Sequence, residues 1–136
     1  MSQTFHQHVQ QGPYDCGPTC LRMVSEYYGK PAVIKTDTRD RGANLAELVK
    51  DAELSGFEAC AVRCRDQMAI WEIPLPAVAH WIEAGKEHWV VMVEIKNDRI
   101  YLADPSWPFG GLRSVSFADL AEFWDGILML LVPKAR

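Results

Sequence analysis

Residues 10–29 read QQGPYDCGPTCLRMVSEYYG and contain the cysteine around which the rest of the chain is interpreted. Pro18 is compatible with the first turn of a helix, because the first N–H groups of a helix have no intrahelical partner in any case. Apolar residues then recur at helical spacing until Gly29 ends the pattern. The stretch therefore predicts a helix over 17–28, with Cys16 at its amino end.

The remaining sequence predicts one more long helix, followed by strands. An apolar stripe indicates a helix over 44–55, after which the apolar residues alternate with polar ones, as in strands. The expected strands are 57–64, 75–82, 88–96, 99–105 and 126–133, and a short helix is expected over 117–124. Because helices precede strands joined by hairpins, we expect an α+β fold, with N-terminal helices packed on a C-terminal antiparallel sheet.

One predicted hairpin has a defined register. Asn97 and Asp98 form a two-residue turn signal between β-rich runs, so Lys96 should lie opposite Arg99. Continued along the strands, this register places His88 opposite a position near residue 107. Asp104 is then a few residues from direct opposition, at the same open end of the hairpin, and a bulge or a twist could bring it within hydrogen-bond reach of His88.

Length and composition indicate one domain, residues 1–136, with a packed core, since 49% of the 136 residues are apolar. The net charge is −4 and no basic run occurs, so no nucleic-acid-binding surface is expected. The longest apolar stretch, GILMLLVP, is too short to span a bilayer, and the N-terminus lacks the features of a secretory signal. We therefore expect a soluble, cytoplasmic chain without a membrane segment.

The position of Cys16 suggests a nucleophile. A cysteine reacts as its thiolate, and the free thiol pKa of roughly 8.5 falls near a helix N-terminus or an imidazolium. Four histidines are available. His6 and His8 lie in a stretch with weak structural signals, whereas His80 and His88 lie on predicted strands. His88 opens its strand, where a base can face a cleft, and is preferred; His80 is the second choice and is otherwise a satisfied strand residue.

Two further residues complete the predicted chemistry. Asp104 can orient the imidazole by accepting a hydrogen bond from its second nitrogen. The side-chain amide of Gln10, six residues before Cys16, can hold an oxyanion together with a backbone N–H. Gln11 is adjacent, so a one-residue shift is an alternative. Asp15 is interpreted as a structural residue whose charge favours the helix N-terminus.

A metal site is the main competing interpretation of the cysteines. The C-x3-C spacing at 16–20 and again at 60–64 is compatible with zinc ligands. Neither pair lies in a glycine-rich knuckle, and one is on a predicted strand. We therefore expect neither a metal nor a cofactor, and interpret Cys20, Cys60 and Cys64 as core or partly exposed residues.

The stretch QQGPYDCGPTCLRMVSEYYGK resembles the N-terminal box of the bacteriocin-processing, double-glycine-type cysteine peptidases. These are papain-like domains, usually found at the N-terminus of peptide-exporting ABC transporters. Later segments resemble the family in the same order: GANLAELVKDAELSGFEACAV, LPAVAHW, HWVVMVEI, IYLADPSWPFGG and FADLAEFWDGILMLL. The resemblance implies a papain-like fold in which Cys16 is the nucleophile, His88 the base, Asp104 its orienting residue and Gln10 the oxyanion donor.

The resemblance also implies a substrate: a peptide cut after a Gly-Gly-type pair in its leader. A narrow cleft would select small residues, and Trp81, Trp89 and Trp107 are candidates for narrowing it; an apolar groove would hold an amphipathic leader helix. The family's membrane helices and nucleotide-binding domain are not in this chain, and residues 30–42 are unusually charged for their place. Alternatives are a free-standing antibacterial effector protease with an immunity partner, or a non-catalytic substrate-binding domain associated with transporter domains.

Overall fold

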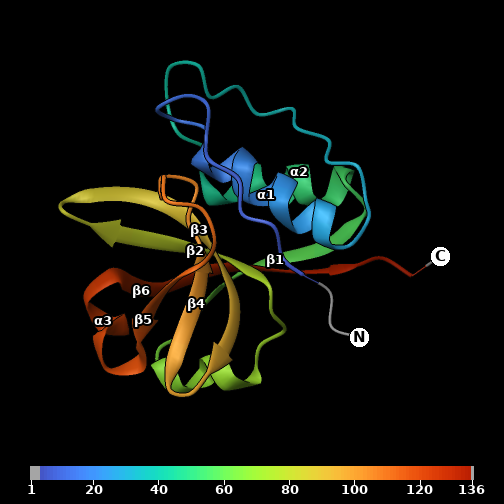
Figure 1. The fold of residues 1–136 in the computed structure, drawn as a ribbon. Helices are drawn as coiled ribbons and strands as arrows, with labels where there is room; N and C mark the ends of the chain where they lie inside the picture. Colours follow the sequence, from blue (N-terminus) through green and yellow to red (C-terminus); the bar gives the residue numbers. More distant parts are fainter. Residues whose placement is uncertain (1–3, 136) are drawn as a thin grey trace.

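The computed structural model describes residues 4–135 (Figure 1). Residues 1–3 and 136, which the predicted domain 1–136 includes, lie outside the described residues. The strands are β1 Phe57–Arg63, β2 Ala77–Glu83, β3 Lys86–Lys96, β4 Arg99–Ala103, β5 Arg113–Ser116 and β6 Trp124–Pro133. They form one sheet in the order β1-β6-β2-β3-β4-β5, and neighbouring strands are antiparallel throughout.

Two helices precede the sheet, as predicted. Helix α1 spans Cys16–Tyr27 and helix α2 spans Leu45–Leu54. Asn44 caps α2: its side chain accepts a hydrogen bond from the Glu47 N–H at 2.8 Å, and the Glu47 carboxylate accepts one from the Asn44 N–H at 3.0 Å. This reciprocal capping box explains why α2 begins where it does. Figure 1 shows both helices on the same side of the sheet.

The predicted strands are confirmed to within a few residues, but the sequence analysis missed two elements. Strand β5 is only four residues long and follows an irregular segment, and the 3-10 turn η1, Gln67–Glu72, lacks a regular pattern. The helix expected over 117–124 is divided into a 3-10 turn η2, Phe117–Asp119, and a one-turn helix α3, Leu120–Phe123. Ser116 accepts a hydrogen bond from the Asp119 N–H at 3.1 Å, which fixes the start of this segment.

The sheet separates two hydrophobic clusters. One includes Leu21 and Val24 of α1 together with Leu48 of α2, and the opposite one includes Trp81 of β2 and Leu120 of α3. Each cluster has fully buried members, so both faces of the sheet are covered. Burial of this kind is the main source of the fold's stability, at roughly 25 cal/mol per Å² of apolar surface.

A bulge in β3 shifts the register of the hairpin formed by β3 and β4, and so changes which side chains at its open end lie on the same face of the sheet. The turn residues Asn97 and Asp98 have φ values of 53° and 60°, as a two-residue hairpin turn requires, and Lys96 pairs with Arg99 as predicted. The pairs Glu94–Tyr101 and Met92–Leu102 are then consecutive, so Val93 is the extra residue of a bulge.

The bulge has a direct consequence for the predicted site. In the unbroken register, Asp104 would lie opposite Val91, whose side chain is on the other face of the sheet from that of His88. With the bulge, Val91 pairs with Ala103, so Asp104 follows opposite Val90 and shares a face with His88. The bulge anticipated as one possible route is therefore present, and it aligns the two residues.

Within residues 4–135, no helix has both the length and the apolar character needed to cross a membrane.

Candidate active site

The four residues predicted from the sequence line one cleft. Gln10, Cys16, His88 and Asp104 all contribute to a cavity of ≈ 1090 Å³. They come from the N-terminal segment, the first residue of α1, the beginning of β3 and the end of β4. The fold thus brings together residues that are up to 94 positions apart in the chain, from position 10 to position 104.

Cys16 lies at the start of α1, which packs closely against its neighbours. A side chain at Gly17 would place a Cβ 2.9 Å from Leu48 and 3.3 Å from the Trp89 indole, so a residue without a side chain is needed here. Cys16 itself is buried. The absence of a side chain at Gly17 therefore allows the amino end of α1, with its cysteine, to approach β3.

The electrostatics of Cys16 differ from the expectation. Burial raises the pKa of the Cys16 thiol, and the backbone N–H groups of Trp89, Gly17 and Cys16 itself only partly offset this effect. The helix N-terminus therefore acts in the predicted direction, but desolvation is the larger effect. The lowered pKa expected from the sequence is therefore wrong, because the burial of a side chain cannot be read from its neighbours in the chain. The N–H of Trp89 is part of the sulfur's surroundings, which places Cys16 beside the residue that follows His88.

His88 faces Asp104 through one of its ring nitrogens. The Nε2 atom of His88 is 3.6 Å from Asp104 Oδ1, which is longer than a hydrogen bond. Nε2 is also one of the buried polar atoms without a hydrogen-bond partner among the described residues. The pairing leaves Nδ1 as the nitrogen that is not directed at the carboxylate. At 3.6 Å the ring and the carboxylate are close enough to interact electrostatically when the ring is protonated, but they form no hydrogen bond.

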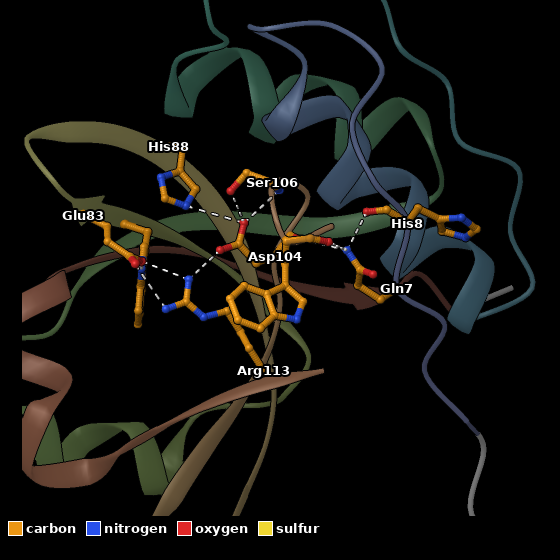
Figure 2. A network of polar contacts seen from close by, with 9 residues as sticks. Gln7, His8, Glu83, His88, Asp104, Ser106 and Arg113 are labelled. Carbon is orange, nitrogen blue, oxygen red and sulfur yellow. Dashed lines mark hydrogen bonds and ion pairs between the residues drawn. The ribbon is translucent and has the colours of Figure 1, made fainter. Parts of the chain in front are cut away.

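Asp104 is buried, with 1% of its surface exposed, but well supplied with partners. Ser106 donates to Oδ1 from its N–H at 2.9 Å and from its hydroxyl at 2.7 Å, and Arg113 Nη1 donates to Oδ2 at 2.9 Å. Figure 2 shows His88 and Ser106 around one oxygen and Arg113 at the other. Burial raises the pKa of Asp104, but the His88 imidazole and the two Ser106 donors outweigh it, so the pKa is well below its usual range.

Gln10 is anchored beside the cleft. Its backbone N–H donates to the Pro105 carbonyl at 2.9 Å, and its Nε2 donates to the Gly12 carbonyl at 2.7 Å. One amide hydrogen is therefore engaged, and the second has no hydrogen-bond partner among residues 4–135. Asp15 holds the same turn, because its carboxylate accepts from the N–H groups of Gln11 and Gly12 at 3.2 and 2.8 Å. Asp15 thus has a structural role, as predicted, but by fixing this loop and not by capping α1.

His80, the second-choice base, lies in the same cleft. Its Nδ1 is 2.7 Å from Asp125 Oδ2, and its Nε2 is 3.6 Å from Glu87 Oε1. Its ring is 5.1 Å from the Trp89 ring, centroid to centroid. His80 is therefore a partnered residue, as expected, and with Asp125 it forms a second histidine–carboxylate pair.

The three tryptophans proposed to narrow the cleft have different positions. Trp89 and Trp107 line it. Trp89 is further fixed by its indole N–H, which donates to the Ala43 carbonyl at 2.9 Å. Trp81 was wrongly included: it is fully buried in the opposite cluster and stacks on Phe123. Alternate residues of β2 point to opposite faces of the sheet, and the sequence does not say which face meets the cleft, so Trp81 was assigned to the wrong face.

The other three cysteines are free and differ in burial. Cys20 is buried in α1, as predicted, whereas Cys60 is exposed on β1 and Cys64 is half-buried after it. Among residues 4–135, no group of three or more His, Cys, Asp or Glu side chains is arranged to hold a metal ion.

The sequence analysis missed the residues that surround Asp104. Ser106 was two positions away, in a turn-forming Asp-Pro-Ser sequence, and was detectable from that context. Arg113 and Glu83 gave no local signal, because they belong to β5 and β2 and meet only through the sheet.

Helices on one side of an antiparallel sheet, with a cysteine at a helix start and a His–Asp pair in one cleft, define the class of papain-like peptidase domains. The chain belongs to the Peptidase C39 family, whose model matches residues 4–136. It is 33% identical over 136 residues to the Lactococcin-G-processing and transport ATP-binding protein LagD of Lactococcus lactis subsp. lactis. That match covers 93% of this chain and 19% of LagD, so the chain spans about a fifth of this relative's length.

Other relatives support the same family. The Colicin V secretion/processing ATP-binding protein CvaB of Escherichia coli is 28% identical, over 90% of this chain and 17% of CvaB. A double glycine motif protease from an AMS/PCAT transporter, solved in complex with its leader peptide, has a TM-score of 0.84 at 23% identity, covering 97% of this chain and 94% of that one. The peptidase domain of Streptococcus ComA has a TM-score of 0.82 at 22% identity, covering 96% and 100%. These structures establish the fold.

Proposed function

We propose that this peptidase domain is a cysteine endopeptidase with Cys16 as nucleophile, His88 as base, Asp104 as its orienting carboxylate and Gln10 as oxyanion donor. The observation that carries the proposal is that these four side chains, distant in sequence, line one cleft. Each has the chemistry that its role requires.

The raised thiol pKa favours one order of events. Because burial keeps the Cys16 proton on sulfur, the imidazole takes that proton as the sulfur attacks, rather than holding a preformed thiolate. The C–S bond forms while the carbonyl π electrons move to oxygen, which gives a tetrahedral oxyanion held by Gln10. The imidazolium then returns the proton to the amide nitrogen as the C–N bond breaks, which leaves a thioester. Water then attacks the thioester, and the thiol is regenerated. Asp104, ionised and buried, stabilises the imidazolium throughout.

The proposed substrate is a peptide cut after a Gly-Gly or similar small pair. Two observations support this. LagD and CvaB are processing proteins by name, and the structurally similar protease from an AMS/PCAT transporter is a double glycine motif protease solved with its leader peptide. In this chain, Trp89 and Trp107 line the cleft and leave less room for large side chains beside the sulfur. Transporter domains are the proposed partners, since the related proteins are far longer than this chain.

The test is cleavage of a synthetic peptide with a central Gly-Gly, followed by mass spectrometry. The wild type should cut after the second glycine, and Cys16→Ala should lower the rate by at least about 10³-fold while circular dichroism stays unchanged. Cys20→Ala, one turn along the same helix, is the matched control and should retain activity. Cutting that persists in Cys16→Ala would refute the assignment of the nucleophile.

Chemical labelling gives a second test that needs no substrate. Iodoacetamide should alkylate Cys16 faster than Cys20 and Cys64, and His88→Gln should slow the labelling of Cys16. Labelling of Cys60, which is exposed, provides the reference rate for an unassisted thiol. Tight peptide binding without cleavage by the wild type would instead indicate a domain that only holds its substrate.

A further inference from the structure

Arg113 joins two carboxylates behind the His88–Asp104 pair. Its Nη1 donates to Glu83 Oε1 and to Asp104 Oδ2, both at 2.9 Å, and its Nη2 is 3.3 Å from Glu83 Oε2. The side chain of Arg113 is 15% exposed and that of Asp104 is 1% exposed, so water screens this contact weakly. The proposed mechanism assigns no role to Arg113 or to Glu83.

The guanidinium is fixed by more than its ion pairs. It lies 5.1 Å from the centroid of the Trp107 ring, in a cation–π contact, and Trp107 lines the cleft. Glu83 is held as well, because the Trp81 indole N–H donates to its Oε1 at 2.9 Å. Figure 2 shows the resulting chain of contacts, with Arg113 between Glu83 and Asp104 and His88 beyond the carboxylate.

In this arrangement Arg113 and Glu83 have opposite electrostatic effects on the His88 imidazole. The charge of Arg113 offsets the negative charge that Asp104 presents to His88, and Glu83 in turn offsets Arg113. We propose that Arg113 and Glu83 are positioning residues that hold Asp104 in place and together set the net charge beside the His88 ring, and hence the pH range of catalysis. This inference rests on the proposed function, because it assigns the reaction to His88.

Other charged and titratable groups face the same cleft and belong to its electrostatics. They are Cys16 on α1, His80 on β2, and Lys86 and Glu87 on β3. Cys20 of α1 does not line the cleft, since it is fully buried, but it interacts electrostatically with Cys16 and Asp104. None of them bridges Asp104 through a hydrogen bond as Arg113 does. The variants below leave all five unchanged, so their contribution is constant.

The signs of the expected shifts follow from charge alone. Removing a positive charge near titrating groups raises their pKa values, and removing a negative charge lowers them. Arg113→Met should therefore move both limbs of the kcat/KM profile to higher pH, and Glu83→Gln should move both to lower pH. The double variant removes one charge of each sign, so its limbs should return close to those of the wild type.

The experiment measures kcat/KM against pH for the wild type, Arg113→Met, Glu83→Gln and the double variant, using the Gly-Gly peptide. We expect shifts of about 0.3–1 pH unit in opposite directions for the single variants. Arg113→Lys keeps the charge but not the two-pronged geometry, so it should lower kcat with its limbs unmoved. A purely structural role would lower activity in all variants without opposite shifts, and that result would overturn the inference.

A second readout separates this inference from the proposed function. Titration of the His88 ring by NMR, assigned with a His88→Gln variant, reports the charge beside the imidazole without any catalysis. If the wild type fails to cut the peptide but the ring titrates at higher pH in Arg113→Met and at lower pH in Glu83→Gln, the proposed function is wrong and the electrostatic role stands. Unmoved or same-direction titrations would refute the role. If Arg113→Met does not fold, the direction seen in Glu83→Gln decides.

Discussion

Two histidines line the cleft, and their pairings with aspartates differ in distance and in burial. His80 and Asp125 are 2.7 Å apart, whereas His88 and Asp104 are 3.6 Å apart. By distance alone, the first pair is the better hydrogen bond. Yet the side chain of Asp125 is 25% exposed, and that of Asp104 is almost completely buried. The comparison shows that the shorter His–Asp contact belongs to the more exposed carboxylate.

What distinguishes the second pair is its surroundings. Asp104 receives two donors from Ser106 and one from Arg113, so its position and ionisation are set by the protein rather than by water. His88 also adjoins Trp89, whose N–H is near the Cys16 sulfur, whereas His80 contacts the Trp89 ring. This position next to Trp89 is the reason for proposing His88 as the base for Cys16, whereas His80 is held by Asp125.

The strongest test of the difference between His80 and His88 replaces each histidine by glutamine in turn. His88→Gln should reduce kcat/KM by about 10³-fold or more, since it removes the base, while His80→Gln should reduce it by less than about 10-fold. Peptide cleavage at pH 7 measures both. Comparable losses in the two variants, with both proteins folded, would mean that His80 also acts in the reaction.

A smaller effect is expected from the carboxylates. Asp104→Asn should reduce kcat by about 10²-fold or more, because the amide no longer stabilises an imidazolium and can favour the wrong tautomer. Asp125→Asn is the matched control, and its kcat should change by only a few fold. A larger loss of kcat in Asp125→Asn than in Asp104→Asn would contradict the assignment of Asp104 as the orienting carboxylate.

The smallest effect concerns stability against acid. The pKa of Asp104 is lowered in the folded state, so this group contributes stability above its unfolded pKa of about 4. That contribution is lost as the pH falls toward the folded pKa. The free energy of unfolding of Asp104→Asn should be about 1–3 kcal/mol below that of the wild type at pH 7, and the gap should narrow below about pH 4. Urea unfolding from pH 7 to pH 3 measures it, and a gap independent of pH would contradict it.

Much of this molecule could be predicted from short-range patterns. The helical spacing after Cys16, the alternation over residues 57–64 and the Asn97-Asp98 turn each depend on neighbouring residues, and the elements that they predict are present. The elements that escaped prediction, β5 and η1, are short and lack a regular pattern. Trp81 was misplaced because alternation along a strand does not say which face meets the cleft.

By itself, the sequence determined the order of helices and strands, the family resemblance, and the four side chains expected to meet in the cleft. The tertiary structure decided how they meet. The bulge at Val93 turned Asp104 to the same face as His88, burial raised the thiol pKa against the effect of the helix N-terminus, and β2 and β5 brought Glu83 and Arg113 behind the pair. The physical reason is that desolvation and pairing between strands depend on residues far apart in the chain, whereas spacing patterns record only near neighbours.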